Sequence, residues 1–226
     1  MGFFLFCLRI IPLYDDKTLF EGNKMDIRRV YFSFVWRHLD INTRKKLEQD
    51  AMYYMSLHKT ARKSVYDVLI EHQAYRAIFY YRTSDETELT KFLIKVLEKF
   101  VRNTKTVEIH GKIGPRLIIT HNCSILNLKR AGSDLTVLPY VLIGKGKCIN
   151  GKDIPVFGKN VHIGGSSTII GGITIGNNVN IGAHSLINYN VPSNCTVVGN
   201  PARIIKLNEQ KCNILLSEYN NAKRKS

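Results

Sequence analysis

The hydrophobic positions follow two different periods along the chain. From about Lys24 to Arg102 they recur at the spacing of an α-helix, and Gly is absent from Lys24 to Thr106. This pattern predicts helices over the segments RKKLEQDAMYYMSLH, SVYDVLIEHQAYRAIFYYR and ELTKFLIKVLEKFVRN. Asn42 and Thr43 stand before the first segment and are predicted to form its N-cap region.

After Thr106 the apolar positions repeat every six residues, with a shift of two residues between Ile143 and Phe157. They are Val107, Ile113, Ile119, Ile125, Ala131, Val137, Ile143, Phe157, Ile163, Ile169, Ile175, Ile181 and Ile187. Gly often follows them, and we expect it there because it tolerates tight turns and positive φ. A β-sandwich is the alternative, but its turns recur irregularly at about 8 to 12 residues. We therefore predict a β-helix, in which three short strands make one triangular coil.

These periods predict three parts. A helical domain covers 1–104, the repeats cover 105–206 with an inserted loop at 145–156, and a basic tail covers 207–226. The apolar run from Met1 to Tyr14 is too short to span a bilayer and lacks the charged start of a signal peptide. It is either a packed or membrane-skimming first segment, or part of an extension, 1–24, that precedes a natural start at Met25.

The composition limits the partners and the compartment. The chain carries 33 Lys and Arg against 18 Asp and Glu, a net charge of +15, which favours anionic partners of several kinds. No zinc-finger, recognition-helix or RNP motif supports nucleic-acid binding. Five cysteines without a CxxC pair indicate a reducing compartment, with neither a disulfide framework nor a metal site. We expect a cytoplasmic protein and leave open peripheral contact with the inner face of the membrane.

Three segments carry a resemblance to a known family. They are IGNNVNIGAHSLINYNVPSNCTVVGNPARII at 175–205, GKIGPRLIITH at 111–121 and HQAYRAIFYYR at 72–82. The chain resembles the hexapeptide-repeat acyltransferases, in the branch of serine acetyltransferases and capsular polysaccharide O-acetyltransferases. The resemblance implies an α+β chain with an N-terminal α-helical region followed by a left-handed parallel β-helix. It also implies a homotrimer, with higher assembly through the helices left open, and acetyl-CoA as co-substrate without a metal.

The resemblance identifies His121 as the general base of acyl transfer. A hydroxyl is a poor nucleophile at neutral pH, and an imidazole can take its proton. The alternative is a histidine that only fills a turn. Glu108 is expected to orient His121 if the first coil is two residues short, and otherwise is an exposed strand carboxylate.

The residues expected to bind CoA come from the same resemblance. Backbone amides of Gly165 and Ala183 are expected to line its groove, beside Asn180, where relatives often carry Lys. Arg203 either meets the nucleotide end or caps the last coil. Gly144, Lys145 and Lys147, at the start of the inserted loop, are expected near the CoA phosphates, unless this is an ordinary solvated basic loop. Cys148 in that loop is not expected to be a nucleophile, because the family transfers the acyl group directly.

The acceptor is predicted from residues that differ from the serine enzymes. Those enzymes carry Asp before the catalytic histidine and Arg-His-Pro in the loop, whereas this chain has Thr120 and Asp153-Ile154-Pro155. Both charged partners of an amino acid are therefore missing. We predict a sugar or polysaccharide hydroxyl as acceptor, with Thr120, Asp153 and Ile154 in the substrate site. Serine O-acetyltransferase is the alternative, and a structural β-helix or a basic nucleic-acid-binding protein is the non-enzyme alternative.

Overall fold

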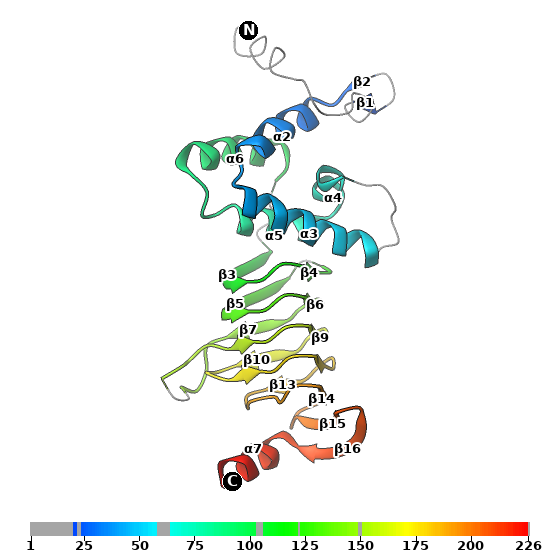
Figure 1. Cartoon of the computed structure of the whole chain (residues 1–226), viewed down its shortest axis with the longest axis vertical. Helices are drawn as coiled ribbons and strands as arrows, with labels where there is room; N and C mark the ends of the chain where they lie inside the picture. The colour runs from blue at the N-terminus through cyan, green and yellow to red at the C-terminus, as the bar shows by residue number, and fades with distance from the viewer. Residues whose placement is uncertain are drawn as a thin grey trace.

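The computed structural model describes residues 20–21, 24–57, 64–102, 106–121, 123–148 and 151–225. A group of helices lies at one end of an elongated molecule, and a stack of short strands continues from it toward a helix at the C-terminus (Figure 1). Within the described ranges, no helix combines the length and the apolar run needed to cross a bilayer. The apolar run from Met1 to Tyr14 lies outside the described residues.

The helical part follows a short antiparallel pair, β1 (Phe20–Glu21) and β2 (Lys24–Met25). Its helices are α2 (Ile27–His38), α3 (Ile41–Leu57), α4 (Val65–Glu71), α5 (Gln73–Arg82) and α6 (Glu88–Phe100). The single helix predicted over 64–82 is two helices, because His72 leaves the helical conformation between α4 and α5.

The predicted N-cap of α3 is corrected by two residues. The Asp40 carboxylate accepts hydrogen bonds from the backbone N–H groups of Asn42, at 2.7 Å, and Thr43, at 3.4 Å. Asn42 and Thr43 are therefore the residues whose amides are capped, and Asp40 is the capping residue.

The repeats form a parallel β-helix with three faces. Face A contains β7 (Leu142–Gly144), β10 (Thr168–Ile170), β13 (Leu186–Ile187) and the first halves of β3 (Val107–Ile113) and β5 (Ser124–Ala131). Face B contains the second halves of β3 and β5, then β8 (Val156–Phe157) and β11 (Thr174–Ile175). Face C contains β4 (Leu117–Ile119), β6 (Leu135–Val137), β9 (Val161–Ile163), β12 (Val179–Ile181) and β14 (Cys195–Val198).

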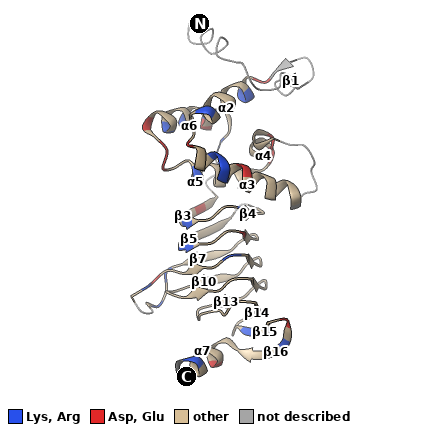
Figure 2. Cartoon of the chain, in the orientation of Figure 1, with Lys and Arg blue, Asp and Glu red and all other residues tan. Residues whose placement is uncertain are grey.

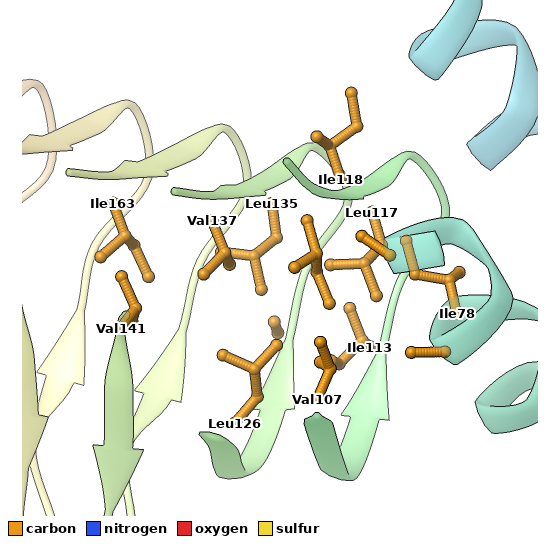
Figure 3. Close-up of a cluster of buried hydrophobic side chains, with 14 of the residues drawn as sticks. Ile78, Val107, Ile113, Leu117, Ile118, Leu126, Leu135, Val137, Val141 and Ile163 are labelled. Carbon is orange, nitrogen blue, oxygen red and sulfur yellow. The ribbon is translucent and has the colours of Figure 1, made fainter. Parts of the chain in front are cut away.

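The predicted apolar positions fill the inside of the coils, with one exception. Figure 3 shows residues such as Val107, Val137 and Ile163 pointing into the space that the strands enclose. Ile125 was predicted to be inside, but it is 43% exposed, while Leu126 beside it is buried. Val107 pairs with Ser124, seventeen residues on, whereas Ile113 pairs with Ala131, eighteen residues on. The pairing of the two strands is thus displaced by one residue up to His110 and returns to the regular spacing after it. This displacement turns Ile125 outward.

The glycines that follow the aliphatic positions have a different cause from the one predicted. Positive φ occurs two residues further on, for example at Ser166 and His184. Most of these glycines are required instead by the neighbouring coil, and Gly144, where a Cβ would meet nothing within 4 Å, is the exception. A Cβ on Gly164 would lie 2.4 Å from the backbone nitrogen of Ala183, and a Cβ on Gly158 would lie 2.6 Å from the carbonyl oxygen of Gly176.

The C-terminal segment predicted as a basic tail is folded. After β14 the chain makes β15 (Arg203–Leu207) and β16 (Gln210–Leu215), which pair antiparallel, and then α7 (Leu216–Lys225). The last coil is thus followed by a hairpin and a helix rather than by another parallel strand (Figure 1).

Candidate functional site

His121 lies in the turn that leads from β4 on face C to β5 on face A, and its side chain is exposed. The equivalent turns of later coils stack beneath it, at Leu138–Tyr140, Gly164–Ser166, Gly182–His184 and Gly199. Backbone hydrogen bonds join them, from Ser166 N–H to Pro139 O and from His184 N–H to Gly165 O, both at 2.9 Å. We call this stack of turns the His121 corner.

Two predicted cofactor residues, Gly165 and Ala183, occupy adjacent turns of the His121 corner. Within the part of the chain that the structure describes, neither of their backbone N–H groups donates to a protein acceptor. The amides on either side do donate; for example, Gly164 N–H bonds to Ile181 O at 2.7 Å. The corner therefore presents a column of amides that are free to bind a carbonyl or phosphate oxygen of a ligand.

Thr120 stands at the position that Gly164 and Gly182 occupy in two later coils. Its backbone N–H donates to Val137 O at 3.1 Å. Its hydroxyl oxygen is buried and has no hydrogen-bond partner among the described residues. An unpaired buried hydroxyl is unfavourable, so this oxygen can gain a hydrogen bond only by a local change of conformation or from a bound molecule.

Glu108 lies on face A and is exposed, in register with Ile125, four residues after His121. Glu108 corresponds to Thr168 of a later coil, and His121 corresponds to Ala183. The chain from Glu108 to His121 is two residues shorter than the chain from Thr168 to Ala183, which is the shortening that the predicted role assumed. No hydrogen bond joins Glu108 and His121 within the described ranges. The orienting role of Glu108 remains a prediction.

The inserted loop leaves from a different corner, between faces A and B, and projects from the coils in Figure 1. It holds Lys145, Lys147, Asp153 and Ile154 of the predicted site, and Gly144, at the end of β7, directly precedes it. Lys145 is paired with the Asp153 carboxylate at 3.0 Å, and this contact lowers the pKa of Asp153. Gly146 N–H also donates to Asp153 O at 3.0 Å, so the base of the loop is closed.

Within one chain, the loop and His121 therefore lie on opposite edges of face A. The three residues of β7 separate the two corners, a span of about 10 Å. The structure thus brings together His121, Thr120, Gly165 and Ala183, and it holds the loop residues apart from them.

The two remaining predicted cofactor residues lie away from the turns. Asn180 is exposed on face C, in register with His162 and Thr196. Arg203 begins β15 and donates a hydrogen bond to the Asn213 side chain at 2.5 Å, so its guanidinium is held by the C-terminal hairpin. That contact agrees with the alternative in which Arg203 caps the last coil.

Tyr140 is a corner residue that the sequence interpretation missed. It is exposed and has φ of 61°, at the same turn position as Ser166 and His184. Counting three residues on from Val137, as from Ile163 and Ile181, would have identified it from the repeat alone.

The charged residues do not gather on one element. Lys and Arg occur in the helical part, along the β-helix and in the C-terminal hairpin and helix (Figure 2). Among the described residues, no three His, Cys, Asp or Glu side chains gather in a way that could hold a metal ion.

Comparison with known proteins finds serine acetyltransferases among the relatives of this chain. The family profile described as "Bacterial transferase hexapeptide (six repeats)" matches residues 155–189. Serine acetyltransferase of Staphylococcus epidermidis is 34% identical over 157 residues, which are 68% of this chain and 66% of that protein. Serine acetyltransferase of Staphylococcus xylosus is 34% identical over 147 residues, 63% of each chain. The chain thus spans just under two thirds of the length of these relatives.

Solved structures agree with the predicted fold. Serine acetyltransferase (CysE) of Neisseria gonorrhoeae superposes with a TM-score of 0.59 at 24% identity, covering 86% of this chain and 77% of that one. Soybean serine acetyltransferase complexed with serine gives 0.56 at 22% identity, covering 80% and 85%. The prediction of N-terminal helices followed by a left-handed parallel β-helix is confirmed. The names of these relatives support the serine alternative and give no support to the sugar acceptor that we predicted first.

Proposed function

This chain is a hexapeptide-repeat protein homologous to serine acetyltransferases, and from that premise we propose that it transfers the acetyl group of acetyl-CoA to the hydroxyl of serine. The observation that carries the proposal is the exposed His121 at the head of a column of unpaired backbone amides. This arrangement supplies a base for the hydroxyl next to donors for a long ligand that carries phosphates and amide carbonyls.

The chemistry needs one proton acceptor. A ring nitrogen of His121 takes the proton of the serine hydroxyl while the hydroxyl oxygen attacks the thioester carbonyl carbon. The carbon–sulfur bond then breaks, and the CoA thiolate leaves and receives the proton. The imidazole returns to its neutral form, so the products are CoA and the acetyl ester of serine.

Acetyl-CoA is proposed to lie along the His121 corner. Its thioester would stand at the first coil, and its pantetheine arm would accept hydrogen bonds from the amides of Gly165 and Ala183. Lys147 is exposed at the loop and is proposed to approach the phosphates of CoA. Lys145 is a weaker choice for that role, because Asp153 already neutralises its charge.

Serine needs partners for its ammonium and carboxylate groups. Thr120 replaces the acidic residue expected before the base, so the ammonium must find its partner elsewhere. Glu108 is an exposed carboxylate on the face next to His121 and is proposed to serve there or to orient the imidazole. The unpaired Thr120 hydroxyl supplies a further polar contact for the substrate.

Trimerisation is proposed because one chain leaves the site incomplete. Ile125 and Leu142 are paired neighbours on face A and are 43% and 41% exposed, which is unusual for aliphatic residues in a packed repeat. A second copy lying against face A would cover them. The second copy would also bring its own inserted loop to the His121 corner of the first copy.

The test is an acetyl-transfer assay with the purified chain, in which the release of the CoA thiol from acetyl-CoA is measured. L-Serine is compared with a panel of hexoses, N-acetylhexosamines, sialic acid and capsular oligosaccharides. We expect serine to have the highest kcat/KM. His121→Asn should lower kcat by about 10²- to 10⁴-fold with little change in the KM for acetyl-CoA, because a general base acts in the transition state.

His110→Asn is the matched control. His110 is also exposed on the first coil, but it lies at the other end of face A. Its replacement should leave kcat within about twofold of wild type. A sugar that exceeds serine in kcat/KM would overturn the proposed acceptor, and an active His121→Asn variant would remove His121 from the mechanism.

A further inference from the structure

The first coil of the β-helix has an edge that no other coil covers. In the sheets formed by the described residues, β3 pairs with β5, and β4 lies at the end of its sheet, beside β6. The outer backbone groups of β3 and β4 would be unpaired unless another part of the chain met them, and a buried unpaired backbone group is unfavourable.

Side chains of α3 and α5 meet this edge. The Asp50 carboxylate accepts a hydrogen bond from Leu117 N–H at 2.8 Å, and Arg82 donates to Gly114 O at 2.6 Å. Asp50 and Arg82 are themselves paired at 2.9 Å, and both are buried. Tyr81 donates to Gly111 O at 2.7 Å. The helical part therefore supplies the hydrogen bonds that a preceding coil would otherwise supply.

Tyr54 makes the contact of this set that lies nearest to His121. Its side chain is 1% exposed, and its hydroxyl donates to the carbonyl oxygen of Ile119. The ring packs edge-on against Tyr75, with centroids 5.9 Å apart, so its position is fixed within the helical part. Tyr54 thus connects the interior of the helices with the end of β4.

That carbonyl belongs to the peptide group between Ile119 and Thr120. The N–H of the same peptide group donates to Val137 O at 3.1 Å. One peptide plane is therefore held on one side by the next coil and on the other side by Tyr54. The chain turns immediately after this plane, and His121 is the second residue of the turn. The orientation of the plane sets the direction in which the backbone presents the imidazole.

We propose that Tyr54 is a positioning residue for His121, acting through the Ile119 carbonyl. The inference rests on the proposed role of His121 as the base. It assigns the helical part a function in catalysis as well as in stability, because the hydrogen bond to Ile119 fixes the geometry of the turn. A shift of the base by about 1 Å is enough to lower a rate by up to about a hundredfold.

The test compares Tyr54→Phe with Tyr75→Phe. Tyr75 is 0% exposed and donates to Leu47 O at 2.8 Å, so both changes remove one buried tyrosine hydroxyl that bonds to a backbone carbonyl. Of these two tyrosines, only Tyr54 bonds to the β-helix. We expect a similar fall in Tm for both variants. Tyr54→Phe should lower kcat about tenfold or more with the KM for acetyl-CoA within about twofold. Tyr75→Phe should keep both parameters within about twofold.

Tyr81→Phe tests whether the effect is local. Tyr81 bonds to the same coil, but at Gly111 and Ile113, further along the chain from His121. A smaller loss of kcat than that of Tyr54→Phe is expected. An equal loss would assign the effect to the whole edge and overturn the specific role of the Ile119 carbonyl.

The double variant Tyr54→Phe/His121→Asn separates positioning from general destabilisation. If Tyr54 acts through His121, adding Tyr54→Phe to His121→Asn should reduce the residual rate by less than about twofold. Additive losses would overturn the proposal, as would a Tyr54→Phe variant that fails to fold while Tyr75→Phe folds. Full activity of His121→Asn alone would instead contradict the proposed function, so the two failures are distinguishable.

Discussion

Arg116 and Asp134 illustrate what a single ion pair does in this fold. Arg116 belongs to the turn after β3, and Asp134 belongs to the turn directly beneath it. The guanidinium donates two hydrogen bonds to the carboxylate, one of them at 2.7 Å. This contact holds the pKa of Asp134 below its ordinary value. The pair therefore joins the first two coils at the corner between faces B and C.

Replacement of Asp134 by Asn should lower the free energy of unfolding near pH 7 by about 0.5–1 kcal/mol, because the pair is partly exposed. A carboxyl group with a lowered pKa stabilises the fold above its unfolded pKa of about 3.9, and this contribution disappears as the pH falls through the folded value. Urea unfolding of both proteins at several pH values measures the difference. It should be constant from about pH 5 to 7 and shrink below about pH 4.

Asp85→Asn makes the same change of charge at an exposed residue before α6 and is the control. It should show little difference in stability across this range. An Asp134→Asn difference that grows on acidification would contradict the direction of the shift.

The residues of the site could be predicted from the sequence only where they belong to the repeat. Counting from the aliphatic positions was enough to place Gly165 and Ala183 in adjacent turns. The Tyr54 hydroxyl is different, because it meets Ile119 across 65 positions of the chain. Helical periodicity identifies Tyr54 as a core residue and carries no information on which carbonyl its hydroxyl meets.

At the scale of elements, the period of six predicted the coils and failed where one turn holds an extra residue. Ile125 keeps the period in the sequence, but the turn before it is one residue longer than in the later coils. Ile119 is six residues before Ile125, whereas Val137 is five residues before Leu142. The side chain of Ile125 therefore turns outward. The sequence period gives the average spacing of the inward side chains. It does not reveal a local displacement of one residue that a nearby irregularity compensates. The glycines behave similarly, because their requirement comes from a neighbouring coil eighteen residues away and not from their own φ.

The close approach of coils makes a matched pair of glycine substitutions informative. Gly164 and Gly144 each follow an inward Ile. A Cβ on Gly164 would lie 2.4 Å from Ala183 N, whereas a Cβ on Gly144 would meet nothing within 4 Å. Gly164→Ala should therefore lower the free energy of unfolding by about 1–3 kcal/mol, since backbone must move to admit the methyl group.

Gly144→Ala should change the free energy of unfolding little, or raise it by about 0.4–1 kcal/mol through the unfolded state. Urea unfolding of the two variants measures both effects. Equal stability of the two would mean that the coils adjust to a side chain at this position without strain.

At the scale of the whole molecule, the exposed aliphatic residues of face A carry the proposal of a trimer. Leu142→Lys would place a charge in the proposed interface, next to Ile125, and should shift the sedimenting species from trimer to monomer. The activity of the variant should fall when the trimer dissociates, because the His121 corner would lose the wall that the neighbouring copy is proposed to supply.

Ile205→Lys is the control for this change. Ile205 lies on β15 and is 39% exposed, close to the 41% of Leu142, but it belongs to the C-terminal hairpin. That variant should sediment as wild type does. A wild-type chain that is monomeric and fully active, or a trimeric Leu142→Lys variant, would contradict the proposed assembly.

The stacking of turns at the His121 corner also fixes a length. Four steps from coil to coil separate the turn of His121 from the turn that contains Gly199, which is about 19 Å at about 4.8 Å per step. Substitutions on the faces leave this distance unchanged, whereas removal of one complete coil would shorten it by a single step. For a cofactor bound along this corner as proposed, the length available therefore changes in steps of one coil and is set by the number of repeats between the two ends.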